Sequence, residues 1–397
     1  MTSVDAAESS ATSVTPEVDG FEAGRVLTIS AAHGVHDTYT AFLPSLLPVF
    51  IANLALSKTE AGLLTVFMQG PSLLQPFIGH VADQVSLRYL VILAPAATAA
   101  MMSLLGIAPA YGVLALLLVL AGLSSAGIHS VGPVMAGRLS GESLGRGMGF
   151  WMVGGELGRT LGPIIIVSAL QILTPRGTPW LMLGGVLMSG ILLVLLQDVA
   201  GRPPEAGAAL PWGDALRALG PLLTPLVGII IVRSFMVSAL TTYLPTFLSE
   251  EGSGLFFAGA SLSILEGAGV IGALVGGSMS DRLGRRTVLF ASMVATPLLM
   301  FVFLATDGAV HILLLLLLGL SALSVGPVIM ALVQESLPEN RALANGLYMA
   351  LSFVLRSGVI VLIGAIGDWL SLRAAFAVSA SAPLLGLPLI LLLPGRD

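Results

Sequence analysis

The sequence predicts an all-α membrane protein in which twelve transmembrane helices form two pseudo-symmetric six-helix halves. The chain is 56% hydrophobic and only 10% charged, far below the roughly 25% charged residues of a soluble domain. Its apolar runs are each about 20 residues long, which suits helices that cross the hydrocarbon core, and the alternating pattern of barrel strands is not seen. Sequence repeats, the third observation, divide the chain near its middle.

The repeats relate the two halves to each other. Residues 130–134, Ser-Val-Gly-Pro-Val, return unchanged at 324–328, an offset of 194. A glycine, an aspartate and an arginine recur with an offset of 198: Gly79, Asp83 and Arg88 return as Gly277, Asp281 and Arg286. A third echo, of residues 78–88 at 363–373, has a different register. Repeats within halves are typical of secondary transporters, which bind substrate where the repeats meet.

The expected elements follow one another with short connections. Residues 1–24 carry five acids and no base, which indicates a disordered acidic tail and not a signal peptide. Residues 25–197 form the first half, 198–220 a cytoplasmic linker containing Pro203 and Pro204, and 221–397 the second half. The expected spans centre near Ala41, Gly70, Thr98, Gly122, Gly162, Met188, Val237, Ala268, Val294, Leu320, Val354 and Pro383.

The basic residues predict the orientation. With a cytoplasmic N-terminus, eleven of the seventeen Lys and Arg residues fall in inside segments and three fall outside. This excess predicts a multi-pass protein of the inner (plasma) membrane with both termini cytoplasmic. The last three, Arg159, Arg233 and Arg356, lie within spans.

Several classes of function are excluded or disfavoured by what the sequence lacks. Without cysteine, neither a disulfide nor a thiolate metal site can form. The phosphate-binding Gly-x-x-x-x-Gly-Lys-Ser/Thr motif is absent, and the single lysine is Lys58, so we expect no nucleotide. Without a nucleophile–base pair, we expect no enzyme and no cofactor. The expected partners are the lipid bilayer, protons and a small-molecule substrate, with no nucleic acid, and the protein is expected to be a monomer.

A glycine-rich basic loop carries a family resemblance. Residues 277–286, with Gly277, Asp281, Arg285 and Arg286, resemble the signature loop of the major facilitator superfamily. The first-half copy keeps Gly79, Asp83 and Arg88 but has Ser86 and Leu87 where the pattern has glycine and arginine. The resemblance implies that both copies act as conformational latches on the cytoplasmic side in the outward-facing state. Glycine permits close helix approach, and the aspartate can accept hydrogen bonds at a helix N-terminus.

A second motif lies in the fifth span. Gly158, Gly162 and Pro163 resemble the antiporter motif of the same superfamily, although small residues four apart also serve ordinary helix packing. Together with Gln75-Pro76 and His33 with Asp37, the chain resembles the fosmidomycin-resistance branch of these transporters. The charges at Glu156, Arg159, Glu266 and Arg356 depart from what that branch requires, so its substrate does not simply carry over.

Six charged residues within spans are the candidate site. Each would cost about 3 kcal/mol unpaired at the bilayer centre, so they must pair or line water. Glu156 and Arg159 share a helix face and can pair, and the family implies that Glu266 lies near Arg159. Burial disfavours a charged carboxyl group, so Asp37 and Glu266, then Glu156, are the expected proton carriers.

The expected substrate contacts come from basic and polar side chains. Arg233 and Arg356 lack an acid within four residues, so they either bind an anionic group of the substrate or pair with Asp37 or Glu266. The other candidates for substrate contact are Arg159, His33, His36, His129, Gln69 and Tyr243.

The histidines allow a further alternative. His33, His36 and Asp37 share a helix face and could bind a divalent metal with His129 as a fourth ligand. We favour histidines that line a cavity, with no metal site. The resemblance then implies proton-coupled export, by alternating access, of a small and anionic organic compound or drug. The alternatives are proton-coupled import of an organic anion and, third, export of a divalent metal through His33, His36 and Asp37.

Overall fold

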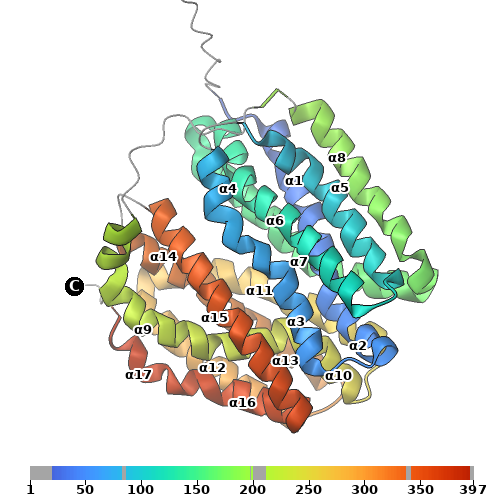
Figure 1. Ribbon diagram of the computed structural model, residues 1–397. Coiled ribbons are helices and arrows are strands. Elements are labelled where there is room, and N and C mark those ends of the chain that lie inside the picture. Colours follow the sequence, from blue (N-terminus) through green and yellow to red (C-terminus); the bar gives the residue numbers. More distant parts are fainter. Residues whose placement is uncertain (1–19, 83–85, 197, 200–211, 337–340, 394–397) are drawn as a thin grey trace, which may run out of the picture.

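The computed structural model describes residues 20–82, 86–196, 198–199, 212–336 and 341–393, and within these residues it is helical without strands. Residues 1–19 of the expected tail, Asp83, and residues 200–211 of the expected linker lie outside this description. Two groups of helices pack side by side, one from each half of the sequence (Figure 1). The predicted all-α membrane fold in two halves is confirmed.

The first half begins with two broken helices. Its elements are α1 (Ala23–Thr40), α2 (Phe42–Leu54), α3 (Lys58–Gln69), η1 (Gly70–Leu74), α4 (Gln75–Ala82), α5 (Arg88–Leu104), η2 (Leu105–Ile107), α6 (Tyr111–Leu139), η3 (Gly141–Ser143), α7 (Leu144–Gly177), η4 (Thr178–Leu181) and α8 (Met182–Leu196). Proline causes one of these breaks: Pro71 lacks the N–H that a continuous helix needs, and a 3₁₀ turn separates α3 from α4. At the far end of α7, Thr174 adopts a positive φ of 59° just before Pro175, and the chain turns back into α8.

The second half starts inside the range expected for the linker. Its elements are α9 (Trp212–Ser238), a π-helical turn η5 (Ala239–Tyr243), α10 (Leu244–Glu250), α11 (Leu255–Leu283), α12 (Arg285–Ala305), α13 (Val310–Leu323), α14 (Val325–Ser336), α15 (Arg341–Trp369), α16 (Leu372–Leu385) and α17 (Leu387–Ile390). Gly284 forms the tight turn between α11 and α12 with a φ of 89°, a conformation that favours glycine.

Nine helical segments of the described chain are long and apolar enough to span a membrane. One of them, residues 146–196, contains the turn at Thr174 and therefore supplies two of the expected spans. The broken pairs α1–α2 and α3–α4 stand where the first two spans are expected. The architecture is thus consistent with twelve spans. Large apolar side chains such as Ile172, Val194 and Leu385 are exposed, as expected for a surface that meets lipid.

The two halves meet along a seam. Buried apolar side chains gather in separate clusters within each half, around Trp151 and Phe42 in the first and around Phe247 and Ile329 in the second. Between the halves, α7 packs against α11, α3 against α15, and α2 against α10 and α11. The charged candidates Arg159, Glu266 and Arg356 lie on these seam helices.

Candidate functional site

Close packing of α1 against α7 builds the site. A Cβ atom on Gly158 would lie 2.2 Å from the carbonyl oxygen of Gly34, and one on Gly162 would lie 2.3 Å from that of Thr38. Gly154, one turn earlier, would meet the Ser30 carbonyl at 2.1 Å. Glycine at every fourth position therefore lets the two backbones touch. The motif that resembles the antiporter sequence brings Asp37 on α1 beside Arg159 on α7.

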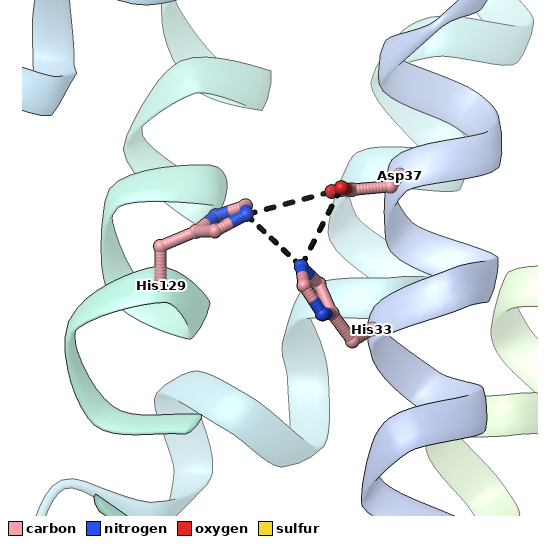
Figure 2. Close-up of side chains that lie close together, drawn as sticks. All are labelled: His33, Asp37 and His129. Atoms are coloured by element: carbon pink, nitrogen blue, oxygen red, sulfur yellow. Dashed lines mark hydrogen bonds and ion pairs between the residues drawn. The ribbon is translucent and has the colours of Figure 1, made fainter. Parts of the chain in front are cut away.

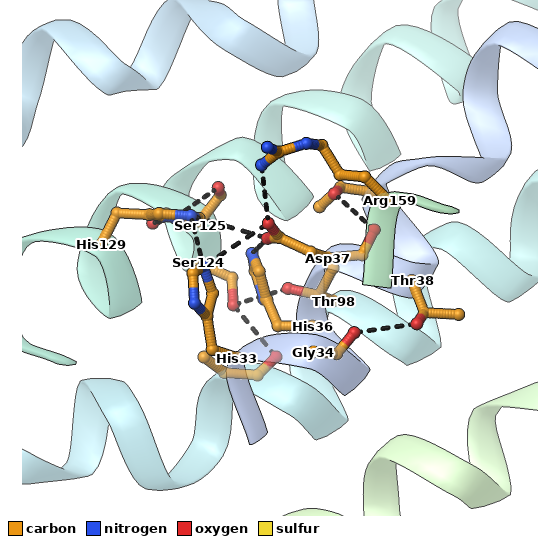
Figure 3. A network of polar contacts seen from close by, with 12 residues as sticks. His33, Gly34, His36, Asp37, Thr38, Thr98, Ser124, Ser125, His129 and Arg159 are labelled. Carbon is orange, nitrogen blue, oxygen red and sulfur yellow. Dashed lines mark hydrogen bonds and ion pairs between the residues drawn. The ribbon is translucent and has the colours of Figure 1, made fainter. Parts of the chain in front are cut away.

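Asp37 is the centre of a polar network (Figure 3). Its side chain is buried, and Oδ2 lies 3.4 Å from Nη1 of Arg159 and 3.4 Å from Nε2 of His33. Oδ1 lies 3.5 Å from Nε2 of His129, which comes from α6. Three basic side chains thus surround this carboxylate. The sequence named all four residues, and the structure brings them together.

His36 lies beside the network. It is fully buried, and neither ring nitrogen has a hydrogen-bond partner among the described residues. Its Nε2 is 4.0 Å from Oδ1 of Asp37, beyond hydrogen-bond distance. Of the four residues in the metal alternative, His33, Asp37 and His129 therefore lie together and His36 lies apart.

The ion pair predicted within α7 is confirmed. The Glu156 carboxylate contacts Nη2 of Arg159, three residues along the same helix. Arg159 thus serves two acids, Glu156 and Asp37, and its side chain is still 41% exposed. A guanidinium that remains accessible while it is paired can also meet a ligand in the seam.

Glu266 and Arg356 form the opposite side of the seam. Glu266, half-buried on α11, is close enough to Arg159 and Arg356 for electrostatic interaction, as expected. Within the described part of the chain it has no hydrogen-bond or ion-pair partner. Arg356, on α15, donates from Nη2 to Oγ1 of Thr241 at 2.7 Å, while its Nε has no partner among the described residues.

Three other candidates lie apart from this cluster. Arg233 donates to the Ala322 carbonyl oxygen at 3.2 Å and borders a cavity of about 20 Å³ between helices of the second half. That volume holds about one water molecule. Tyr243 is fully buried, with its hydroxyl 2.9 Å from the Ile360 carbonyl and 3.1 Å from that of Lys58. Gln69 is half-buried at the end of α3.

Tyr243 belongs to the closed end of the seam, which we define by Lys58, Tyr243, Glu250 and Asp368. The Asp368 carboxylate accepts hydrogen bonds from the backbone N–H groups of Lys58 at 2.6 Å and Thr59 at 2.9 Å. It thus caps α3 from the other half of the molecule. The Lys58 ammonium lies 3.1 Å from the Glu250 carboxylate, a second link between the halves.

The loop predicted to be a latch lies at the opposite end of α11 from the closed end. Arg285 contacts Asp281 at 2.7 Å and Glu335 on α14 at 2.7 Å, both residues of the second half. Arg286 donates to the Leu393 carbonyl. In the first-half copy, the Arg88 guanidinium lies 5.3 Å from the Tyr89 ring. Gly79 is in α4, and Asp83 lies outside the described residues.

Comparison with known proteins identifies the family. The model of the Major Facilitator Superfamily matches residues 29–357 and 268–397. The chain belongs to this superfamily. It is 25% identical to the fosmidomycin resistance protein of Escherichia coli (strain K12) over 386 residues, covering 93% of this chain and 92% of that protein. It is 26% identical to YfnC, an uncharacterized MFS-type transporter of Bacillus subtilis (strain 168), with the same coverage.

Solved structures share the fold. A bacterial homologue of the human lysosomal transporter Spinster, in an inward-facing and occupied conformation, superimposes with a TM-score of 0.80 at 13% identity, over 94% of this chain and 97% of the other. A D-xylose–proton symporter gives a TM-score of 0.69 at 17% identity, over 93% and 97% of the two chains. The predicted family and its transporter fold are confirmed. The protein is a multi-pass membrane transporter.

Some site residues gave no signal in the sequence. Trp151 stacks on His33 at 3.9 Å between ring centroids and offers it a carbonyl oxygen, and Thr241 binds Arg356. Both contacts join residues more than a hundred positions apart. Gly155 could have been suspected from its glycine-rich surroundings: a Cβ atom there would lie 2.4 Å from Cε1 of His33.

Proposed function

We propose that the protein exports a small anionic organic compound in exchange for protons, by alternating access, from an inner membrane in which both termini are cytoplasmic. The observation that carries the proposal is the set of charges across the seam. Arg159 of the first half and Arg356 of the second both interact electrostatically with Glu266, which has no ion-pair partner in the described chain. An anion between the two arginines would compete with this carboxylate.

This arrangement links the charge of Glu266 to the binding of an anion. When the substrate leaves, the negative charge of Glu266 interacts with the two guanidinium groups. When Glu266 binds a proton, that interaction ends and the arginines become available to an anionic group of the substrate. Protonation of Glu266 therefore favours binding of an anion, so exchange additionally requires that the transporter change conformation with either the proton or the substrate bound, and not with both. The named resistance of the Escherichia coli relative favours export.

Alternating access is supported by the two ends of the seam. The closed end holds the halves together through Asp368 and Lys58, and at the other end Arg285 pairs with Asp281 and Glu335 of its own half. Breaking the contacts of the closed end while the halves approach each other at the opposite end would expose the site to the other side. Short polar contacts at helix ends suit such a switch because each is weak enough to be reversed.

Reconstituted protein tests the proposal. Proteoliposomes loaded with a pH-sensitive dye receive a gradient of fosmidomycin as the probe. Antiport predicts proton movement against the direction of the probe, and Glu266→Gln should abolish that movement while probe exchange between the two sides persists. Proton movement in the same direction as the probe would establish the importing symporter instead. Absence of any proton movement during measurable probe flux would refute coupling.

Asp37→Asn provides the comparison for Glu266→Gln. Asp37 is surrounded by Arg159, His33 and His129, so its charge is needed for local structure. Removing this charge should lower the melting temperature, whereas Glu266→Gln should leave it nearly unchanged because Glu266 has no paired base in the described chain. If the two substitutions had the reverse effects, Asp37 would be the proton carrier.

A further inference from the structure

Three side chains in the first half, those of His33, Asp37 and His129, point toward one another (Figure 2). Nε2 of His33 and Nε2 of His129 are 3.2 Å apart, and they lie 3.4 and 3.5 Å from the two carboxylate oxygens of Asp37. His33 and Asp37 are each only 4% exposed. Among the described residues, this is the group whose side chains could together hold a metal ion.

The opposite ring nitrogens determine which atoms carry protons. Nδ1 of His33 lies 2.8 Å from the Trp151 carbonyl oxygen, and Nδ1 of His129 lies 2.9 Å from that of Ser125. A carbonyl oxygen can only accept, so each Nδ1 must carry a hydrogen. In the neutral rings, each Nε2 then presents a lone pair toward the other and toward a carboxylate. Such a convergence of electron pairs is favourable only with a cation between them.

We propose that His33, Asp37 and His129 bind a divalent transition-metal ion of the zinc class. Ligand atoms placed about 2.0–2.1 Å from Zn²⁺ at tetrahedral angles are about 3.3 Å apart, which is the spacing seen here. Two imidazoles and one carboxylate form a common ligand set for such ions, and three protein ligands leave a position for water or for an anionic group. This inference differs from our expectation from the sequence, and it does not depend on the proposed direction or coupling of transport.

The surroundings of the cluster support it in three ways. Metal-bound histidines almost always donate their second ring N–H to a carbonyl or carboxylate, as both do here. Asp37 and Glu156 together outweigh the positive charge of Arg159, which leaves one negative charge to offset the ion. Gly155 carries no side chain that would collide with the ligands, since a Cβ atom there would lie 2.8 Å from Nε2 of His33.

Metal binding can be measured on the purified full-length transporter with Zn²⁺, Co²⁺ and Mn²⁺ as probes, without any transport substrate. We expect one ion per chain by elemental analysis, a higher melting temperature with Zn²⁺, and visible absorption from bound Co²⁺ that indicates nitrogen ligands and low coordination number. His129→Gln should weaken Zn²⁺ binding about 100-fold or more. The His129 side chain is 31% exposed, so this variant should fold.

The control is another buried histidine. His311, in the second half, has Nε2 3.1 Å from the Phe303 carbonyl oxygen, and His311→Gln should leave metal affinity unchanged. Equal loss in both variants would contradict the assigned ligands. Absence of stoichiometric metal and of any metal-dependent rise in melting temperature in the unmodified protein would overturn the proposal, and a shared proton would then be the cation between the rings.

Discussion

The two arginines without an acid on their own helix have different surroundings. Arg356 reaches Thr241 near the seam and interacts with Glu266, whereas Arg233 binds a backbone carbonyl of its own half beside a cavity of about 20 Å³. From the sequence the two were equivalent candidates for binding an anion. The distinction depends on the direction in which each arginine side chain points from its helix. The spacing of residues along the chain does not determine that direction.

Substitution by lysine should separate these roles. Arg356→Lys keeps the charge but loses the planar fork, so it should weaken binding of an anionic probe by about 1–3 kcal/mol and change the ligand-free melting temperature little. Arg233→Lys should leave probe affinity unchanged, whereas Arg233→Ala should lower the melting temperature. Thermal melts with and without fosmidomycin measure both effects. Normal binding by Arg356→Lys together with weakened binding by Arg233→Lys would reverse the assignment.

A contact between residues close together on one helix could be predicted from the sequence. The pair of Glu156 and Arg159 could be predicted because residues three apart on a helix share a face. His129 was a candidate from its residue type, but its contact with Asp37 required the packing of α6 against α1. Partners that act through the backbone, such as the Trp151 carbonyl, are invisible in any sequence pattern.

At the scale of elements, the contact between α1 and α7 determines the site. The glycines of α7 lie directly on the α1 backbone, so the distance between Asp37 and Arg159 is set by residues without side chains. The glycines of the motif that resembles an antiporter signature thus hold Arg159, which follows the first of them, against Asp37 of α1.

Gly158→Ala should therefore be destabilising. The new methyl group would lie 2.2 Å from the Gly34 carbonyl oxygen, and separation of the helices should cost about 1–3 kcal/mol, seen as a lower melting temperature. Gly149→Ala, on the same helix with nothing within 4 Å, is the matched control. It should be neutral or slightly stabilising because alanine favours helix. Equal melting temperatures for the two variants would mean that α1 and α7 are not tightly packed.

Helix types and order could be predicted because apolar length is a strong signal, but helix breaks could not be placed. The first two spans are divided at Ala41 and at residues 70–74, where the structure favours turns over a continuous helix. The start of α9 at Trp212 lies within the expected linker, since an amphipathic segment next to a span can continue its helix beyond the apolar run.

At the scale of the whole molecule, the structure places residues 363–373, which resemble residues 78–88, at the closed end of the seam. The aspartate of this segment, Asp368, caps α3 at the closed end, and its glycine, Gly364, allows Tyr243 and the Lys58 backbone to approach within 2.8 Å of where a Cβ would stand. The sequence revealed this repeat but not its role, because similar residues can lie at either end of a membrane-spanning helix.

Removing this cap should loosen the closed end. In a chain without cysteine, spin labels on cysteines introduced at Asn53 and Trp369 report the distance between the two halves there. Asp368→Ala should shift the distance distribution to longer values, since two backbone donors of α3 lose their acceptor. Asp307→Ala removes an exposed acid and should leave the distribution unchanged. A distribution unaffected by Asp368→Ala would exclude a latch at this residue.

Asp281→Asn is the complementary test at the other end. The family resemblance implies that this loop holds its own end of the seam closed in the alternative state. Loss of the Asp281 charge should therefore leave the Asn53–Trp369 distance short. It should also increase the labelling of cysteines introduced in the seam at the end that carries the Asp281 loop. The first-half copy of the loop lacks one glycine and one arginine of the pattern, so we expect a smaller effect from Asp83→Asn. Equal effects would mean that both copies are complete latches.

The single lysine of the chain has a practical consequence. Lys58 carries the protein's one side-chain amine, and that amine lies 3.1 Å from Glu250 with only 21% of the side chain exposed. An amine-reactive reagent therefore modifies, apart from the chain terminus, a single atom whose accessibility depends on whether the halves are joined. The unmutated transporter thus contains its own chemical probe, and acylation rates at Lys58 during turnover would follow the opening and closing of the seam without any added label.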